Sequence, residues 1–96
     1  MSDQEIIPLE ICCSRYHIEQ TFIQTLEEYG LISIHYQETK QFIHREDVPQ
    51  LEQYSRLYYE LDINVPGIDA LQHLLEKIRK LQQESTELRH RLNIYE

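Results

Sequence analysis

Cysteine, histidine and carboxylate side chains are the groups in this 96-residue sequence that could do chemistry. Cys12, Cys13 and His17 could form a metal site or a Cys–His nucleophile pair. Two ligands adjacent in sequence do not make a site, and neighbouring cysteines rarely form a relaxed disulfide. The other histidines show no ligand spacing: His35, His44, His73 and His90. We therefore predict that both cysteines are structural and that the protein holds no metal or cofactor.

The carboxylates do not form a catalytic pair either. Glu27 and Glu28 are adjacent in a predicted helix, so their side chains point to different faces. The two glycines, Gly30 and Gly67, stand alone, which excludes a glycine-rich nucleotide cradle. The spacing of the Ser, His and Asp residues gives no argument for a catalytic triad. We predict that the protein is not an enzyme.

The carboxylates are instead expected to form a binding surface. The chain has 17 acidic and 9 basic side chains, a net charge of −8. Residues 1–70 hold 13 acidic and 4 basic side chains, a net charge of −9. Residues 71–96 hold 4 acidic and 5 basic side chains, a net charge of +1. Such a balance disfavours nucleic acid and anionic membranes as partners and favours an electropositive protein.

The compartment is expected to be the cytoplasm. No stretch approaches the roughly 18 apolar residues of a membrane helix, and the acidic N-terminus lacks the form of a signal peptide. One adjacent cysteine pair is also not the disulfide framework of a secreted domain.

Three helices and a hairpin are predicted in the first two thirds of the chain. Periodicity favours helices over 6–16 and 19–29, the second ended by Gly30, which together suggest a helix-turn-helix. Short β-rich segments at 31–36 and 41–44 predict a hairpin, the wing of a winged helix. A third helix over 48–61 follows, capped by Asp47. Its predicted apolar stripe is Leu51, Tyr54, Leu57, Tyr58 and Leu61, with Tyr59 outside the stripe and available for contact.

A long helix is predicted over 66–95, restarted by Asn64 as its cap. Its roughly 45 Å length exceeds what so small a domain can cover. Apolar residues recur in steps of three and four, with Ser85 in one slot, which is typical of a coiled coil. The predicted dimerisation residues are Leu71, Leu74, Ile78, Leu81, Leu88 and Leu92. We expect the first two turns to pack on the chain itself and the distal half to meet a second copy.

Two domains follow from this division: a head over 1–62 and the long helix over 63–96. Flanking charges such as Glu84 and Arg89 would attract each other across a parallel dimer, but only weakly. They leave the parallel and antiparallel arrangements open.

The order of these elements resembles the MerR group of bacterial regulators, which usually pair antiparallel. The segments Glu27–Ile32 and Gln41–Val48 resemble that group's passages into the wing and into the third helix. The resemblance implies a mainly α fold: a MerR-like winged helix-turn-helix followed by a long C-terminal dimerisation helix. The arginine and tyrosines of DNA-reading members are replaced by Gln24, Thr25 and Leu26, and the wing arginine by Gln41.

The chain more closely resembles the chaperone-modulator (CbpM-type) family over about residues 9–92. The resemblance rests on Cys13, Ile18, Gly30, the segment Leu61–Ile68, and a C-terminal part that includes the segment 88–92. It implies a protein that binds and inhibits the J-domain of a DnaJ-type (curved-DNA-binding) co-chaperone. From the heptad pattern of the long helix we expect this protein to be a homodimer. The candidate contact residues are Glu19, Glu27, Glu28, Glu46, Glu52 and Tyr59.

Two other functions remain open at the level of sequence. One is a MerR-family DNA-binding transcriptional regulator, which the absence of Lys and Arg from residues 17–38 disfavours. The other is an anti-regulator that sequesters a MerR-type subunit through the long helix.

Overall fold

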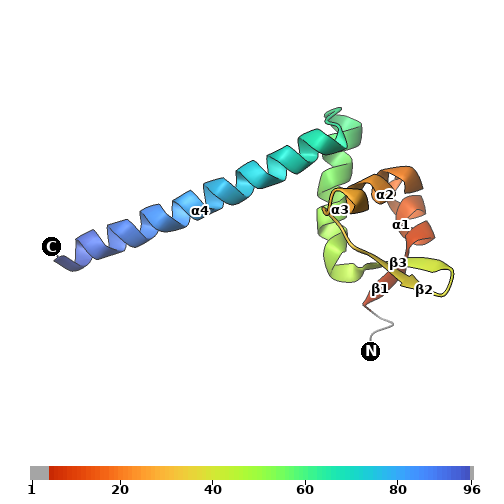
Figure 1. Cartoon of the computed structure of the whole chain (residues 1–96), viewed down its shortest axis with the longest axis horizontal. Coiled ribbons are helices and arrows are strands. Elements are labelled where there is room, and N and C mark those ends of the chain that lie inside the picture. The colour runs from red at the N-terminus through yellow and green to blue at the C-terminus, as the bar shows by residue number, and fades with distance from the viewer. Residues whose placement is uncertain (1–4, 96) are drawn as a thin grey trace.

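The computed structural model describes residues 5–95. Figure 1 shows a small head from which one long helix projects. The elements run β1 (Ile6–Pro8), α1 (Leu9–Tyr16), α2 (Gln20–Glu28), β2 (Ile34–Gln37), β3 (Lys40–His44), the 3-10 turn η2 (Arg45–Asp47), α3 (Val48–Ser55), the π-helical turn η3 (Arg56–Glu60) and α4 (Val65–Tyr95). The predicted fold class, a winged helix-turn-helix with a long C-terminal helix, is confirmed. Residues 1–4 and 96 of the two predicted domains lie outside the described range.

The wing is part of a three-stranded antiparallel sheet in the order β1-β3-β2. Ile43 on the central strand pairs with Ile7 on one side and Ile34 on the other. Residues 6–8 therefore form a strand, and the prediction of a helix from residue 6 is wrong there. Pro8 lacks an N–H but lies on an edge strand, where proline is tolerated, and the helix begins just after it.

The helix-turn-helix is set by two left-handed residues. His17 has φ of 56° and ends α1, and the Ile18 N–H donates to the Cys13 carbonyl at 3.0 Å. Gly30, at φ 73°, ends α2 as predicted. The Leu31 N–H donates to the Leu26 carbonyl at 2.9 Å, which completes a Schellman motif. This bond also explains why β2 begins at Ile34 rather than at residue 31.

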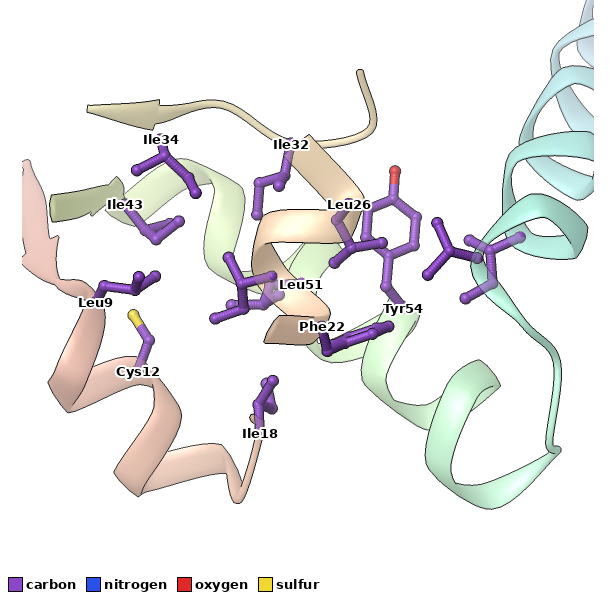
Figure 2. Packing of buried hydrophobic residues seen from close by; sticks show 13 residues of the cluster. Leu9, Cys12, Ile18, Phe22, Leu26, Ile32, Ile34, Ile43, Leu51 and Tyr54 are labelled. Carbon is purple, nitrogen blue, oxygen red and sulfur yellow. The ribbon is translucent and has the colours of Figure 1, made fainter. Parts of the chain in front are cut away.

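One apolar core joins these elements, as Figure 2 shows. Ile23, Leu26, Ile43 and Leu51 are fully buried, and they come from α2, β3 and α3. Val65 and Ile68 of α4 belong to the same cluster, so the base of the long helix is part of the head's core. The complete cluster is Leu9, Cys12, Ile18, Phe22, Ile23, Leu26, Ile32, Ile34, Ile43, Leu51, Tyr54, Val65 and Ile68.

The third helix departs from the sequence prediction after Ser55, where it widens into the π-helical η3. The Leu61 N–H donates to the Arg56 carbonyl, five residues back, at 3.2 Å. A turn with i→i+5 bonds holds extra residues, so the side chains that follow rotate out of α-helical phase. Tyr58 is consequently 36% exposed and Leu61 64% exposed, and their predicted places in the buried stripe are wrong.

The two predicted helix caps have different outcomes. Asp47 precedes α3 but makes no side-chain capping bond, because its backbone is already helical within η2. Asn64 caps α4 as predicted, since its Oδ1 accepts a 2.8 Å bond from the Gly67 N–H. A Cβ on Gly67 would lie 2.9 Å from Cγ2 of Ile63, so this close approach favours glycine in the first turn of α4.

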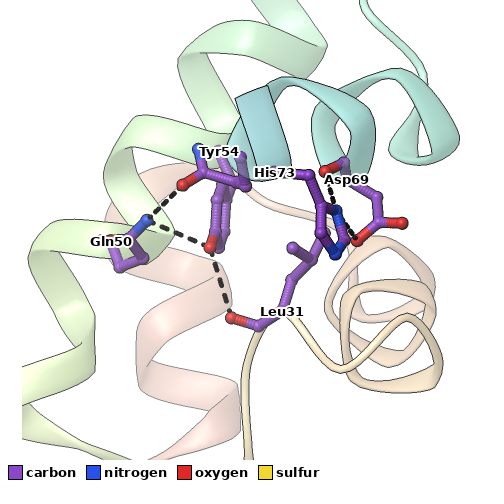
Figure 3. A network of polar contacts seen from close by, with 6 residues as sticks. Leu31, Gln50, Tyr54, Asp69 and His73 are labelled. Carbon is purple, nitrogen blue, oxygen red and sulfur yellow. Dashed lines mark hydrogen bonds and ion pairs between the residues drawn. The ribbon is translucent and has the colours of Figure 1, made fainter. Parts of the chain in front are cut away.

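A polar network joins α3 to the base of α4 and to the turn after α2 (Figure 3). The Tyr54 hydroxyl donates to the Leu31 carbonyl at 3.3 Å and accepts from Nε2 of Gln50 at 3.0 Å. Nε2 of Gln50 also lies 3.5 Å from Oε1 of Gln72 on α4. Burial raises the pKa of the Tyr54 phenol, so it stays neutral and keeps this donor role.

Beyond its base, α4 leaves the head. The molecule measures 61 × 37 × 21 Å, and its radius of gyration is 17.8 Å. A compact chain of this length has a radius of about 12–13 Å. Leu71 and Leu75 are half-buried, whereas Ile78, Leu81, Leu88 and Leu92 farther along the helix are exposed. The contact of α4 with the head is therefore confined to its first turns.

Candidate partner-binding face

Helix α2 presents an acidic and amide-rich surface. Its buried side, Phe22, Ile23 and Leu26, packs into the core. The opposite side carries Gln24 and the exposed Glu28, where a DNA-reading helix would need cations. Residues 17–38 contain no Lys or Arg, so α2 would repel phosphates.

Two side-chain hydrogen bonds tie α2 to the wing. Oε1 of Glu27 accepts a 3.0 Å bond from the Tyr36 hydroxyl on β2. Nε2 of Gln20 donates a 3.0 Å bond to Oε1 of Gln41 on β3. Gln20 and Glu27 are seven residues apart, so both lie on the edge of α2 that faces the hairpin. We call the resulting continuous surface the α2–wing face, formed by Gln20, Gln24, Glu27, Glu28, Tyr36 and Gln41.

The Tyr36–Glu27 bond also has an electrostatic effect. The hydrogen bond from Tyr36 to the Glu27 carboxylate, together with burial and the negative charge, raises the pKa of the phenol. Tyr36 therefore stays protonated at neutral pH and remains a donor to Glu27. One of the two predicted acidic contacts on α2 thus has an internal partner, whereas Glu28 is exposed.

Glu19 and Tyr59 are brought together by the fold. The backbone N–H of Glu19 donates a 3.0 Å bond to the Tyr59 hydroxyl across 40 residues. This bond joins the start of α2 to the π-helical turn. Burial raises the pKa of the Tyr59 phenol, and the nearby Glu19 carboxylate adds to the rise, so the hydroxyl stays neutral.

The other two predicted contacts lie elsewhere. Glu46 is exposed in η2, beside Glu5, His44 and Arg45. Glu52 is half-buried on α3. Neither residue belongs to α2 or to the hairpin of β2 and β3. The six predicted contact residues therefore do not form one cluster.

The cysteines have no features of a reactive site. Cys12 is 1% exposed, and both thiols are free. Burial raises the pKa of each thiol, so each stays protonated and weakly nucleophilic. Among the described residues, no group of three or more His, Cys, Asp or Glu side chains is arranged to hold a metal ion.

The predicted dimerisation residues line one side of α4. Leu71 is half-buried near the head, and the next five range from 49% to 64% exposed. Those five are Leu74, Ile78, Leu81, Leu88 and Leu92. In the single chain these five side chains are largely exposed to water.

Sequence reasoning missed the contacts that organise the head. The ties between α2 and the wing join residues 9 and 21 positions apart, and only the fold brings them together. It also missed the aromatic group of Phe22, Tyr58 and Tyr59, because the π-helical turn changes the direction of the two tyrosines. Two adjacent tyrosines were the available signal.

Comparison with known proteins agrees with this geometry. Residues 7–90 match the family described as MerR HTH family regulatory protein, and the chain belongs to that family. It is a regulatory helix-turn-helix family rather than a known enzyme family. No curated protein and no solved structure matches the chain. Within the described residues, every helix is too short or too polar to cross a bilayer.

Proposed function

We propose that this protein is a chaperone modulator that binds and inhibits the J-domain of a DnaJ-type (curved-DNA-binding) co-chaperone, without binding DNA itself. The observation that carries the proposal is the α2–wing face. It has the position of a DNA-reading surface in a MerR-type fold, but it is lined by carboxylates, amides and a tyrosine. Its chemistry suits a cationic protein surface and not a phosphate backbone.

The charge distribution supports a basic partner. Residues 1–70 carry a net charge of −9, and the J-domain presents a basic helix beside its His-Pro-Asp loop. Opposite fields of this kind speed encounter and favour one partner over others. Because DnaK uses the same basic helix, an acidic head bound there would block stimulation of DnaK by occlusion.

We further propose that the protein acts as a cytoplasmic homodimer joined through α4. The stripe from Leu74 to Leu92 recurs at coiled-coil spacing, and its five apolar residues are 49–64% exposed in the single chain. Pairing would bury these leucines and hold two heads at a fixed separation.

A binding and inhibition assay tests the central proposal. The full chain is titrated into the isolated J-domain of the DnaJ-type co-chaperone from the same organism, and DnaK ATP hydrolysis is followed in parallel. We expect micromolar or tighter binding that weakens with salt, together with loss of J-domain stimulation. No binding at micromolar concentration would refute the role.

A matched pair of charge reversals locates the contact. Glu28→Lys reverses an exposed charge on α2, whereas Glu87→Lys reverses an exposed charge on the outer side of α4. We expect Glu28→Lys to weaken J-domain binding by about tenfold and to flatten its salt dependence, with Glu87→Lys near wild type. Equal affinities for the two variants would move the interface away from α2.

Glu27 needs a gentler change, because it is the acceptor for Tyr36. Glu27→Gln removes the charge and keeps an oxygen acceptor.

A gel-shift assay at low salt tests the alternative function. Specific DNA binding would favour a transcriptional regulator and contradict the chaperone-modulator proposal.

A further inference from the structure

Two exposed tyrosine rings stand on a rigid base at the end of the head. Tyr58 and Tyr59 are 36% and 40% exposed, and their rings meet edge to face with centroids 4.9 Å apart. The buried Phe22 lies behind both, with centroids 4.4 Å from Tyr58 and 5.4 Å from Tyr59. The bond from the Glu19 N–H fixes the far end of Tyr59. The rings are therefore held in place before any ligand arrives.

These rings form one wall of an open cleft of about 320 Å³. Its lining is Tyr58, Tyr59, Asp62, Ile63 and Asn64. Asp62 is exposed, has φ of 55°, and forms no ion pair within residues 5–95. The amide oxygen of Asn64 is already used by the Gly67 N–H, so Asp62 supplies the available negative charge in the cleft.

Aromatic faces beside an unpaired carboxylate are the surroundings that a side-chain cation prefers. A guanidinium or ammonium group is attracted by the ring quadrupole and can also pair with the carboxylate. Arginine suits this combination best, because its planar group can stack on one tyrosine while its N–H groups donate to Asp62. A phosphate or carboxylate ligand would be repelled by Asp62 and by the carboxylate of Glu19, whose charge acts on Tyr59.

We propose that the cleft between Tyr58, Tyr59 and Asp62 is a binding site for an arginine side chain of a protein partner. The assignment of that partner as the basic J-domain rests on the function proposed above, whereas the preference for arginine rests on the cleft alone. The site adds a second contact to the α2–wing face, and Glu19, at the start of α2, touches Tyr59.

A neutral peptide of the same shape makes the test specific. The ¹⁵N-labelled full chain is titrated with acetyl-Gly-Arg-Gly-amide and, separately, with acetyl-Gly-citrulline-Gly-amide, and amide shifts are followed by NMR. We expect the arginine peptide to shift the amides of residues 58–64 at millimolar concentration and the citrulline peptide to leave them in place. Shifts spread evenly over the acidic head, or equal shifts from both peptides, would overturn the proposal.

Two variants separate the charge from the ring. Asp62→Asn removes the carboxylate and tolerates the left-handed backbone, and its matched control is Glu38→Gln at another exposed left-handed position, φ 58°. Tyr58→Leu removes one aromatic wall, and a thermal melt checks that it folds. We expect Asp62→Asn and Tyr58→Leu each to lower the affinity for the arginine peptide by about two- to fivefold, and Glu38→Gln to leave that affinity unchanged. If Glu38→Gln weakened peptide binding as much as Asp62→Asn, the net charge of the protein would explain the effect, and the proposed site would be contradicted.

The peptide titration does not use a J-domain, so the two proposals fail separately. Arginine binding without J-domain binding would leave the cleft with a different basic partner. J-domain binding unaffected by Asp62→Asn and Tyr58→Leu, together with no peptide shift, would leave the α2–wing face as the interface and refute the cleft.

Discussion

The head buries its apolar side chains, whereas the long helix exposes them beyond its base. In the head, Ile23, Leu26 and Leu51 are fully buried around one core, whereas Leu81 and Leu92 on α4 are 63% and 64% exposed. Burying a leucine is worth about 1.5–3 kcal/mol, so the exposed stripe withholds a large stabilisation from the isolated chain. The head can be understood from its own contacts, whereas α4 beyond its base leaves its apolar residues exposed, and their pairing with a second copy is part of the proposal above.

The largest effect is expected when the same substitution, leucine to alanine, is made in the head and on α4 and the losses of stability are compared. Leu51→Ala should cost about 3 kcal/mol of unfolding free energy, because it opens a cavity in the core. Leu88→Ala removes the same atoms from a 58% exposed site and should cost much less when the protein is dilute enough to be monomeric. Urea unfolding followed by circular dichroism measures both. Similar losses in the dilute protein would mean that the stripe is already covered.

The second change tests the pairing proposed for α4. Leu81→Asp places a charge on the stripe and should weaken the dimer by about 2 kcal/mol, roughly 30-fold in dissociation constant. Gln83→Asp adds the same charge off the stripe and serves as control. Sedimentation equilibrium reports the mass of each variant. A wild-type protein that stays monomeric at high micromolar concentration would contradict the proposed pairing of α4 with a second copy of the chain.

The third change concerns Tyr54, which links the core to the base of α4. Tyr54→Phe should cost about 1 kcal/mol near neutral pH through its lost hydrogen bonds. Because the folded pKa of this phenol is raised, its stabilising contribution is complete below the unfolded pKa and is lost as pH rises above about 10. The difference from wild type should therefore narrow at alkaline pH. Unfolding curves at pH 7 and above pH 10 check this, and a constant difference would contradict it.

The smallest effect is expected at the wing. Tyr36→Phe removes the exposed bond to Glu27 and should leave the unfolding free energy close to that of the wild type. Hydrogen exchange should nevertheless quicken in β2, because the hairpin loses one of its two side-chain ties to α2. Exchange rates in α4 provide the internal control. Unchanged exchange in β2 would show that the Gln20–Gln41 bond is sufficient.

Local signals in the sequence predicted much of this fold. Gly30 ends α2 and Asn64 begins α4 because a left-handed stop and an amide cap need only their immediate neighbours. The strand at Ile6–Pro8 was missed because its hydrogen-bonding partner, β3, lies 34 or more residues away. The widened turn at η3 was missed because an i→i+5 bond leaves no periodic trace in five residues.

The candidate site was predictable in its charge and not in its shape. The absence of Lys and Arg from residues 17–38 already indicated an acidic face. Sequence could not show that Glu27 is held by Tyr36 while Glu28 stays exposed, since that difference arises from packing of the wing. Tyr59 was selected for its exposure, but its bond to Glu19 and its place in an aromatic cleft depend on the π-helical turn.

The single capped turn at the base of α4 has a mechanical consequence. The helix that starts there is a rod of 31 residues, about 46 Å long. A tilt of about 10° at Asn64 would move the far end by roughly 8 Å, so small adjustments beside the head become large displacements at the tip. Val65 and Ile68 are packed in the core of the head, so the rigidity of this packing determines how precisely the far end of α4 is positioned relative to the head.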